Sequence, residues 1–282
     1  MSTQHAAVDS ATPYIAYQTR TPIQIDGHLD ERAWDLAPKS PRFVDVVSGA
    51  PALYESRAAV VWDASALYVG FWIEEPFVQA RQTERDTLVF LDNDVEVFID
   101  GGDTYYEFEI NALGTIYEVF FIWQDAYTRG GRFDIPEFDL LSRKALSFGG
   151  NHDRTGAHFW QGSHPRKTRW AFLDWDLPGL QTAVQITETA TPGPNVRAGW
   201  TVEVAFPWAG MAWLADGRSL PPKDGDQWRL FIGRYQQLHA SGQAMTVGWA
   251  WHPIGSTDNH VPERFTPIQF STTYVDDLPP AS

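Results

Sequence analysis

Apolar and polar positions alternate with a period of two along residues 94–123, which is the pattern of β-strands that bury one face. Val95, Val97 and Ile99 alternate with more polar or aromatic neighbours. After a turn at residues 101–104 the alternation resumes, and a further strand is predicted after Gly114. The pattern therefore predicts three consecutive antiparallel strands.

One face of the first two predicted strands carries carboxylates. Because the turn between them has four residues, a regular register places Glu96 opposite Glu109 and Phe98 opposite Glu107. Directly opposed like charges destabilise a sheet, so their repulsion should raise the pKa of Glu96 or Glu109. The presence of opposed carboxylates on one face of the sheet, despite this repulsion, therefore needs an explanation.

The third strand carries a single charge, Glu118. We expect this residue to mark the acidic side of the strand. On this prediction Ile116, Phe120 and Ile122 share the acidic face, while Tyr117, Val119 and Phe121 turn inward.

The rest of the chain also reads mainly as strands, predicted at 23–25, 57–62, 67–73, 181–188, 199–207, 227–235, 246–251 and 269–273. A short amphipathic helix is predicted at 30–37, with Trp34 inward. We therefore predict an all-β fold, an antiparallel two-sheet β-sandwich in one domain at 14–274. A long aromatic-rich loop insertion at 124–178 should lie over one sheet. Residues 1–13 are expected to be a disordered lead-in and residues 275–282 a C-terminal tail.

The composition narrows the function. The chain has 282 residues, a formal net charge of −15 and no cysteine, which excludes disulfides and thiolate metal sites. Nucleic acid and anionic membranes are not expected as partners, because both bind concentrated Lys and Arg. No apolar run approaches the length of a membrane span. No signal peptide is visible, which predicts a cytoplasmic protein as the chain stands and a secreted one if a leader has been removed.

Four segments in fixed order resemble the carbohydrate-binding module family 9-like proteins, which include sugar-binding modules of xylanases and are DOMON-like. The segments are IDGHLDERAW (25–34), VVWDASALYVGFWI (60–73), DNDVEVFID with YYEFEINALG (92–114) and WAWHPIGSTDNHVPERF (249–265). The resemblance implies a β-sandwich of the jelly-roll or immunoglobulin-like kind. It also implies non-catalytic sugar binding.

The resemblance carries over residue by residue only in part. In the xylanase modules two tryptophans sandwich a terminal sugar; the first position corresponds to Phe90 here, and the second lies near Asn259 and His260. The family glutamate corresponds to Glu96, whereas an arginine on the partner strand is replaced by Glu109. The resemblance therefore implies a shared fold and a changed ligand.

We predict that the acidic, aromatic face binds a saccharide or a sugar-derived ligand. Carboxylates and amides would accept hydrogen bonds from sugar hydroxyls, and rings, with Phe120 among the candidates, would pack against a pyranose. The predicted ligand-binding residues are Phe90, Glu96, Phe98, Glu107, Glu109, Asn111, Trp251, His252, Asn259, His260 and Arg264. The alternative is a solvated outer face, neutralised by arginines such as Arg229, Arg234 and Arg264.

Bound ions are a separate question. Asp92, Asp94, Asp100 and Asp103 offer the hard oxygen ligands that Ca²⁺ takes, although their spacing is not that of an EF-hand. His252 and His260 lack close metal-ligand spacing, so zinc is not expected.

Two other functions stay open at this point. A carbohydrate-active enzyme, either glycoside hydrolase or lyase, could use the Glu96 and Glu109 pair, because retaining glycosidases hold two carboxyl groups about 5 Å apart. No nucleophile elbow, phosphate loop or dinucleotide fingerprint supports catalysis. Haem binding, known among related sandwich domains, is not expected, because the internal methionines, Met211 and Met245, lie outside the strands of the acidic face.

Overall fold

Strands make up most of the regular structure in the computed structural model, which describes residues 12–150, 164–187, 198–240 and 243–278. Most of the predicted lead-in at 1–13 lies outside the described residues. The strands are β1 (Tyr14–Gln18), β2 (Val44–Asp45), β3 (Ser56–Trp62), β4 (Ala66–Glu74), β5 (Asp94–Asp100), β6 (Thr104–Asn111), β7 (Ile116–Trp123), β8 (Ala145–Phe148), β9 (Arg169–Phe172), β10 (Gln181–Thr187), β11 (Gly199–Pro207), β12 (Gln227–Ala240), β13 (Gln243–Ala250) and β14 (Thr266–Tyr274).

Helical structure is limited to short pieces in the described part of the chain. The α-helix is α1 (Arg32–Leu36), which buries Trp34 as predicted. The 3-10 helices are η1 (Val89–Leu91), η2 (Pro136–Phe138), η4 (Trp208–Gly210), η5 (Pro262–Arg264) and η6 (Val275–Asp277). None of these described helices is long and apolar enough to cross a membrane.

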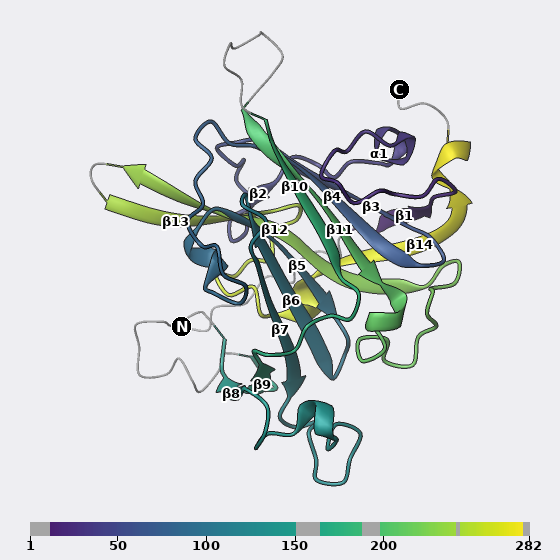
Figure 1. Cartoon of the computed structure of the whole chain (residues 1–282), viewed down its shortest axis with the longest axis vertical. Coiled ribbons are helices and arrows are strands. Elements are labelled where there is room, and N and C mark those ends of the chain that lie inside the picture. Colours follow the sequence, from purple (N-terminus) through teal and green to yellow (C-terminus); the bar gives the residue numbers. More distant parts are fainter. Residues whose placement is uncertain (1–11, 151–163, 188–197, 241–242, 279–282) are drawn as a thin grey trace, which may run out of the picture.

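The strands form one hydrogen-bonded path that folds back on itself (Figure 1). Its order is β10-β11-β4-β3-β1-β14-β12-β5-β6-β7-β9-β8, and β13 pairs with β12 and β2. Side chains from its two halves meet in a shared core: Phe108 on β6 lies 5.6 Å, centroid to centroid, from Phe206 on β11. This arrangement confirms the predicted β-sandwich. The pairings are antiparallel except at β1, which runs parallel to both β14 and β3.

The register of the β5–β6 hairpin is the predicted one. Glu96 pairs with Glu109, and Phe98 pairs with Glu107. Val95, Val97 and Ile99 are fully buried in the main core, so the glutamates point to the opposite face of the sheet. The period-two alternation and the four-residue turn were therefore sufficient to predict the register of this hairpin.

The predicted faces of β7 are wrong. Glu118 points toward the core, where it is fully buried and accepts hydrogen bonds from Tyr106 Oη and, at 3.0 Å, from Leu177 N. Arg85 pairs with the same carboxylate. Consequently Phe120 joins the main core, and Phe121 faces the acidic side together with Tyr117 and Val119.

Three smaller predictions also change. No strand forms at 23–25, although Ile23 is buried in a second apolar cluster. The insertion at 124–178 is not all loop, because it supplies β8 and β9, which extend the sheet beyond β7 (Figure 1). Within the predicted C-terminal tail, Val275 begins η6 and is fully buried.

Candidate ligand-binding pocket

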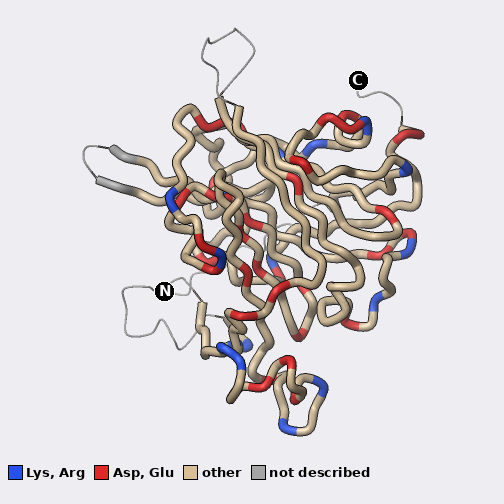
Figure 2. The backbone as a smooth tube through the Cα atoms, in the orientation of Figure 1, with Lys and Arg blue, Asp and Glu red and all other residues tan. Residues whose placement is uncertain are grey.

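A cavity of about 840 Å³ opens on the face of β5, β6 and β7 that points away from the core. Segments far apart in the sequence surround it: residues 45–47, η1, β8, β9, β13 and the loop at 257–260. Asp and Glu outnumber Lys and Arg along the backbone as a whole (Figure 2). Among the described residues that line this cavity, neither Lys nor Arg occurs.

The structure brings six of the predicted ligand-binding residues to this cavity. They are Phe90, Glu96, Glu107, Glu109, Asn259 and His260. The glutamates are at most 5% exposed, so they do not form the solvated outer face considered as the alternative. That these residues contact a ligand stays a prediction.

Phe98 and Trp251 do not line the cavity, because their rings are packed inside apolar clusters of the protein. Phe98 is fully buried between Phe231 and Phe265, with ring centroids 5.6 and 6.0 Å away. Trp251 belongs to the main core, 5.4 Å from the ring of Tyr14. Phe120, considered as a further ring for the sugar, is also a core residue.

Three polar candidates lie outside the cavity as well. Asn111 Oδ1 accepts hydrogen bonds from two backbone amides of its own turn, Leu113 N and Thr115 N, both at 3.0 Å. Arg264 donates to the carbonyl of Ile254 at 3.1 Å and thereby holds the last loop. His252 Nδ1 lies 3.0 Å from the carbonyl oxygen of Pro253.

Three carboxylates meet on this side of the sheet, and two of them, Glu96 and Glu109, line the cavity. Asp94, Glu96 and Glu109 each place one oxygen within 4.8 Å of the others, and all three side chains are buried. Burial, and then the charges of Glu109 and Asp94, raise the pKa of Glu96 well above its ordinary value. The pKa of Asp94 is raised in the same way, by burial first and by Glu109 second.

Asn259 and His260 close over this side of the sheet from the last loop. Asn259 Nδ2 donates a hydrogen bond of 2.7 Å to Glu96 Oε2. His260 Nδ1 lies 3.1 Å from Tyr105 Oη, and its Nε2 lies 3.8 Å from Glu107 Oε1. The loop is thus tied to the acidic side chains of β5 and β6.

Aromatic rings form the wall of the cavity, and most of them were not predicted. Phe90 meets Tyr117 edge to face at 6.3 Å, and Phe121 contacts Phe148 at 5.4 Å. Tyr235 completes the wall, and burial followed by the charge of Glu96 raises its pKa well above the ordinary value. Had Glu118 been assigned to the core, the same alternation would have placed Tyr117 and Phe121 here.

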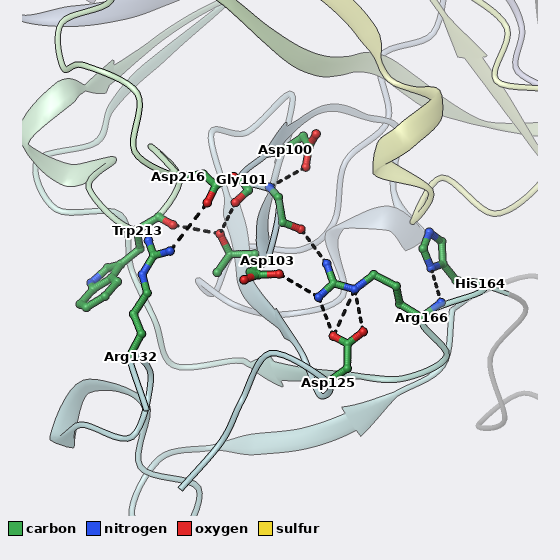
Figure 3. Close-up of polar contacts among 11 residues, drawn as sticks. Asp100, Gly101, Asp103, Asp125, Arg132, His164, Arg166, Trp213 and Asp216 are labelled. Carbon is green, nitrogen blue, oxygen red and sulfur yellow. Dashed lines mark hydrogen bonds and ion pairs between the residues drawn. The ribbon is translucent and has the colours of Figure 1, made fainter. Parts of the chain in front are cut away.

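The four aspartates considered for Ca²⁺ do not share a site. Asp92 Oδ2 accepts the backbone amides of residues 81 and 82, each at 2.8 Å. Asp100 accepts the amide of Gly102 at 2.9 Å, and Asp103 pairs with Arg166 at 2.9 Å (Figure 3). Within the described part of the chain, Asp94 is the one of the four that joins a carboxylate cluster, and its partners are Glu96 and Glu109.

Comparison with known proteins agrees with this architecture. Residues 48–137, which contain β3 to β7, match the family model described as carbohydrate-binding family 9. This part of the chain is therefore similar to carbohydrate-binding family 9. No curated protein matches the chain in sequence.

Solved structures share the fold at low sequence identity. A family 9 carbohydrate-binding module from Caldicellulosiruptor kristjanssonii, in complex with cellotriose, is 13% identical, with a TM-score of 0.50 over 95% of this chain and 99% of that one. A candidate carbohydrate-binding protein from Bacteroides uniformis is 16% identical, with a TM-score of 0.50 over 91% and 98%. Both alignments span nearly the whole sandwich.

Proposed function

We propose that this protein binds a saccharide or a sugar-derived ligand without catalysing a reaction on it, and that the ligand occupies the acidic, aromatic cavity. The observation that carries the proposal is the cavity itself. Its volume of about 840 Å³ falls within the range of small-molecule sites, and carboxylates and aromatic rings share its surface. The fold shared with the module that holds cellotriose supports a saccharide as the ligand class.

The chemistry of the cavity suits sugar recognition. Carboxylates such as Glu96 and Glu109 accept hydrogen bonds from hydroxyl groups, and such charge-assisted bonds are stronger than neutral ones. The half-buried rings of Phe90, Tyr117 and Tyr235 offer apolar surface for the C–H face of a pyranose. Catalysis by Glu96 and Glu109 has no further support from the described residues.

The charge of the cavity should also set the specificity. Glu109 stands where the resembling family has an arginine, and three glutamates line the cavity. A uronic acid would bring its carboxylate close to these side chains, and like charges oppose binding. We therefore expect the metal-free protein to bind neutral sugars and not their uronic acid counterparts.

Titration calorimetry against a panel of mono- and oligosaccharides tests the proposal. We expect heat of binding with at least one neutral sugar, lost in Glu96→Gln and retained in Glu84→Gln, which changes an exposed glutamate outside the cavity. No heat with any sugar would overturn the proposal. Products released from a bound oligosaccharide, and abolished by Glu96→Gln, would replace binding with catalysis.

A further inference from the structure

We propose that Asp94, Glu96 and Glu109 bind a calcium ion beside the cavity. The register of β5 and β6 puts Glu96 opposite Glu109, and the alternation of β5 puts Asp94 on the same face. One oxygen of each residue lies within 4.8 Å of the other two. Ca²⁺ binds oxygen at about 2.3–2.6 Å, so two ligands across one ion lie up to roughly 5 Å apart. The three oxygens fit around a single ion.

A second observation points to a ligand at this cluster. Asp94 is fully buried, and its Oδ1 accepts a hydrogen bond of 3.1 Å from Tyr235 N. Its Oδ2 is buried and has no hydrogen-bond partner within the part of the chain that the structure describes. Burying a carboxylate oxygen without a partner is costly, and a bound cation removes that cost.

Arg234, the buried cation on the neighbouring strand β12, is engaged elsewhere. Its Nη2 donates to Glu75 Oε2 at 3.0 Å, and its Nη1 donates to Ser56 Oγ and to the carbonyl of Glu74, both at 3.1 Å. Its guanidinium therefore forms a buried ion pair with Glu75, and the hydrogen bonds of its two Nη atoms to described residues do not include Asp94.

The ligand set indicates the class of metal. Three carboxylates are hard oxygen donors, which suit Ca²⁺ and do not suit the soft or imidazole-preferring transition metals. Ca²⁺ takes six to eight oxygens in flexible geometry. Glu96 and Glu109 line the cavity, so an ion bound to them faces it and can complete its coordination with water or with ligand hydroxyls. This last step rests on the proposed sugar binding; the ion site itself does not.

The site is tested on the full chain, freed of metal with EDTA and dialysed, in the absence of any sugar. Titration with CaCl₂ should show binding of one ion per chain and should raise the melting temperature. Asp94→Asn should weaken Ca²⁺ binding by more than the roughly 10- to 100-fold that loss of a second-shell partner costs. Asp100→Asn, the same change on the same strand outside the cluster, should leave the affinity unchanged.

If Asp94→Asn does not fold, Glu109→Gln at the cavity surface provides the same comparison. Neither heat nor a thermal shift with CaCl₂ for the wild-type protein would overturn the proposal. So would equal weakening by Asp94→Asn and Asp100→Asn. Repeating the sugar titrations in EDTA separates the two proposals: sugar binding unaffected by EDTA, with no Ca²⁺ binding, removes the ion and leaves the sugar site standing.

Discussion

At the scale of single residues, Glu96 has an unusual position. It is 2% exposed, lies opposite another glutamate, and has its pKa raised by burial and by neighbouring carboxylates. Asn259 is the side chain that donates a hydrogen bond to it at 2.7 Å. A buried carboxylate that lowers the stability of the fold in this way is expected where it contributes to binding a ligand.

Replacing Glu96 with Gln should therefore stabilise the metal-free, sugar-free protein. The change removes like-charge repulsion while keeping an oxygen that can accept from Asn259, so the free energy of unfolding should rise by about 0.5–1 kcal/mol. Urea unfolding in EDTA at neutral pH measures it. A lower stability would mean that the charge is already satisfied without a ligand.

Glu203 should make stability depend on pH. Its carboxylate is fully buried and accepts hydrogen bonds from Asp26 N, Gly27 N and Trp34 Nε1 at 2.8–3.0 Å. Burial raises its pKa to about 7, and these donors offset part of that rise. Since the folded pKa lies above the unfolded value of about 4.3, the folded state binds more protons between the two.

The penalty for ionising Glu203 is thus complete above pH 7 and is relieved as the pH falls toward the unfolded pKa. Stability should increase by about 1 kcal/mol from pH 8 to pH 6 through this group. Urea unfolding at both pH values measures the change. The increase should be larger in the wild-type protein than in Glu203→Gln, and equal increases would assign it to other groups.

At the scale of elements, periodicity and turn length were enough to predict β5 and β6, their register and their faces. They failed for β7, because a charge was taken to mark the outer face. Glu118 instead meets Arg85 and Tyr106, and the contact with Arg85 is set by tertiary structure that no local pattern encodes. The same limit explains why β8 and β9 were predicted as loop: their pairing depends on β7 and not on strong alternation of their own.

Glu118→Gln should therefore act in the opposite direction to Glu96→Gln. An amide cannot keep both the pairing with Arg85 and the bonds from Tyr106 and Leu177, so we expect a loss of about 1–3 kcal/mol in the free energy of unfolding. Parallel urea titrations of the two variants measure the contrast. Stabilisation by both substitutions would show that Glu118 is as poorly satisfied as Glu96.

At the scale of the whole molecule, the cavity is assembled from segments between residues 45 and 260. The sequence predicted its acidic floor from strand alternation, and Phe90, Asn259 and His260 from the family resemblance. It did not predict the rings of Phe121 and Phe148, because the fold alone brings β7 and β8 to one surface. Residues 45–47, η1, β8, β9, β13 and the loop at 257–260 surround the outer face of β5, β6 and β7 and convert it into a cavity.

Substitutions of Phe90 test whether the aromatic wall of the cavity contacts the sugar. Phe90→Ala removes a half-buried ring from the wall and should lower sugar affinity by up to about tenfold, on the scale of about 0.5–1.5 kcal/mol for an aromatic contact. Phe90→Trp, which restores the residue type of the resembling family, should retain binding. Calorimetry with the best sugar of the panel measures both; equal affinities for wild type and Phe90→Ala would place the sugar elsewhere.

The most direct test of the sugar site is a crystal structure with the best-binding neutral sugar. We predict electron density for a sugar ring between the carboxylates of Glu96 and Glu109 and the rings of Phe90 and Tyr117, with its hydroxyls within hydrogen-bond distance of Glu96. Sugar density bound at another surface, with this cavity filled only by solvent, would contradict the account.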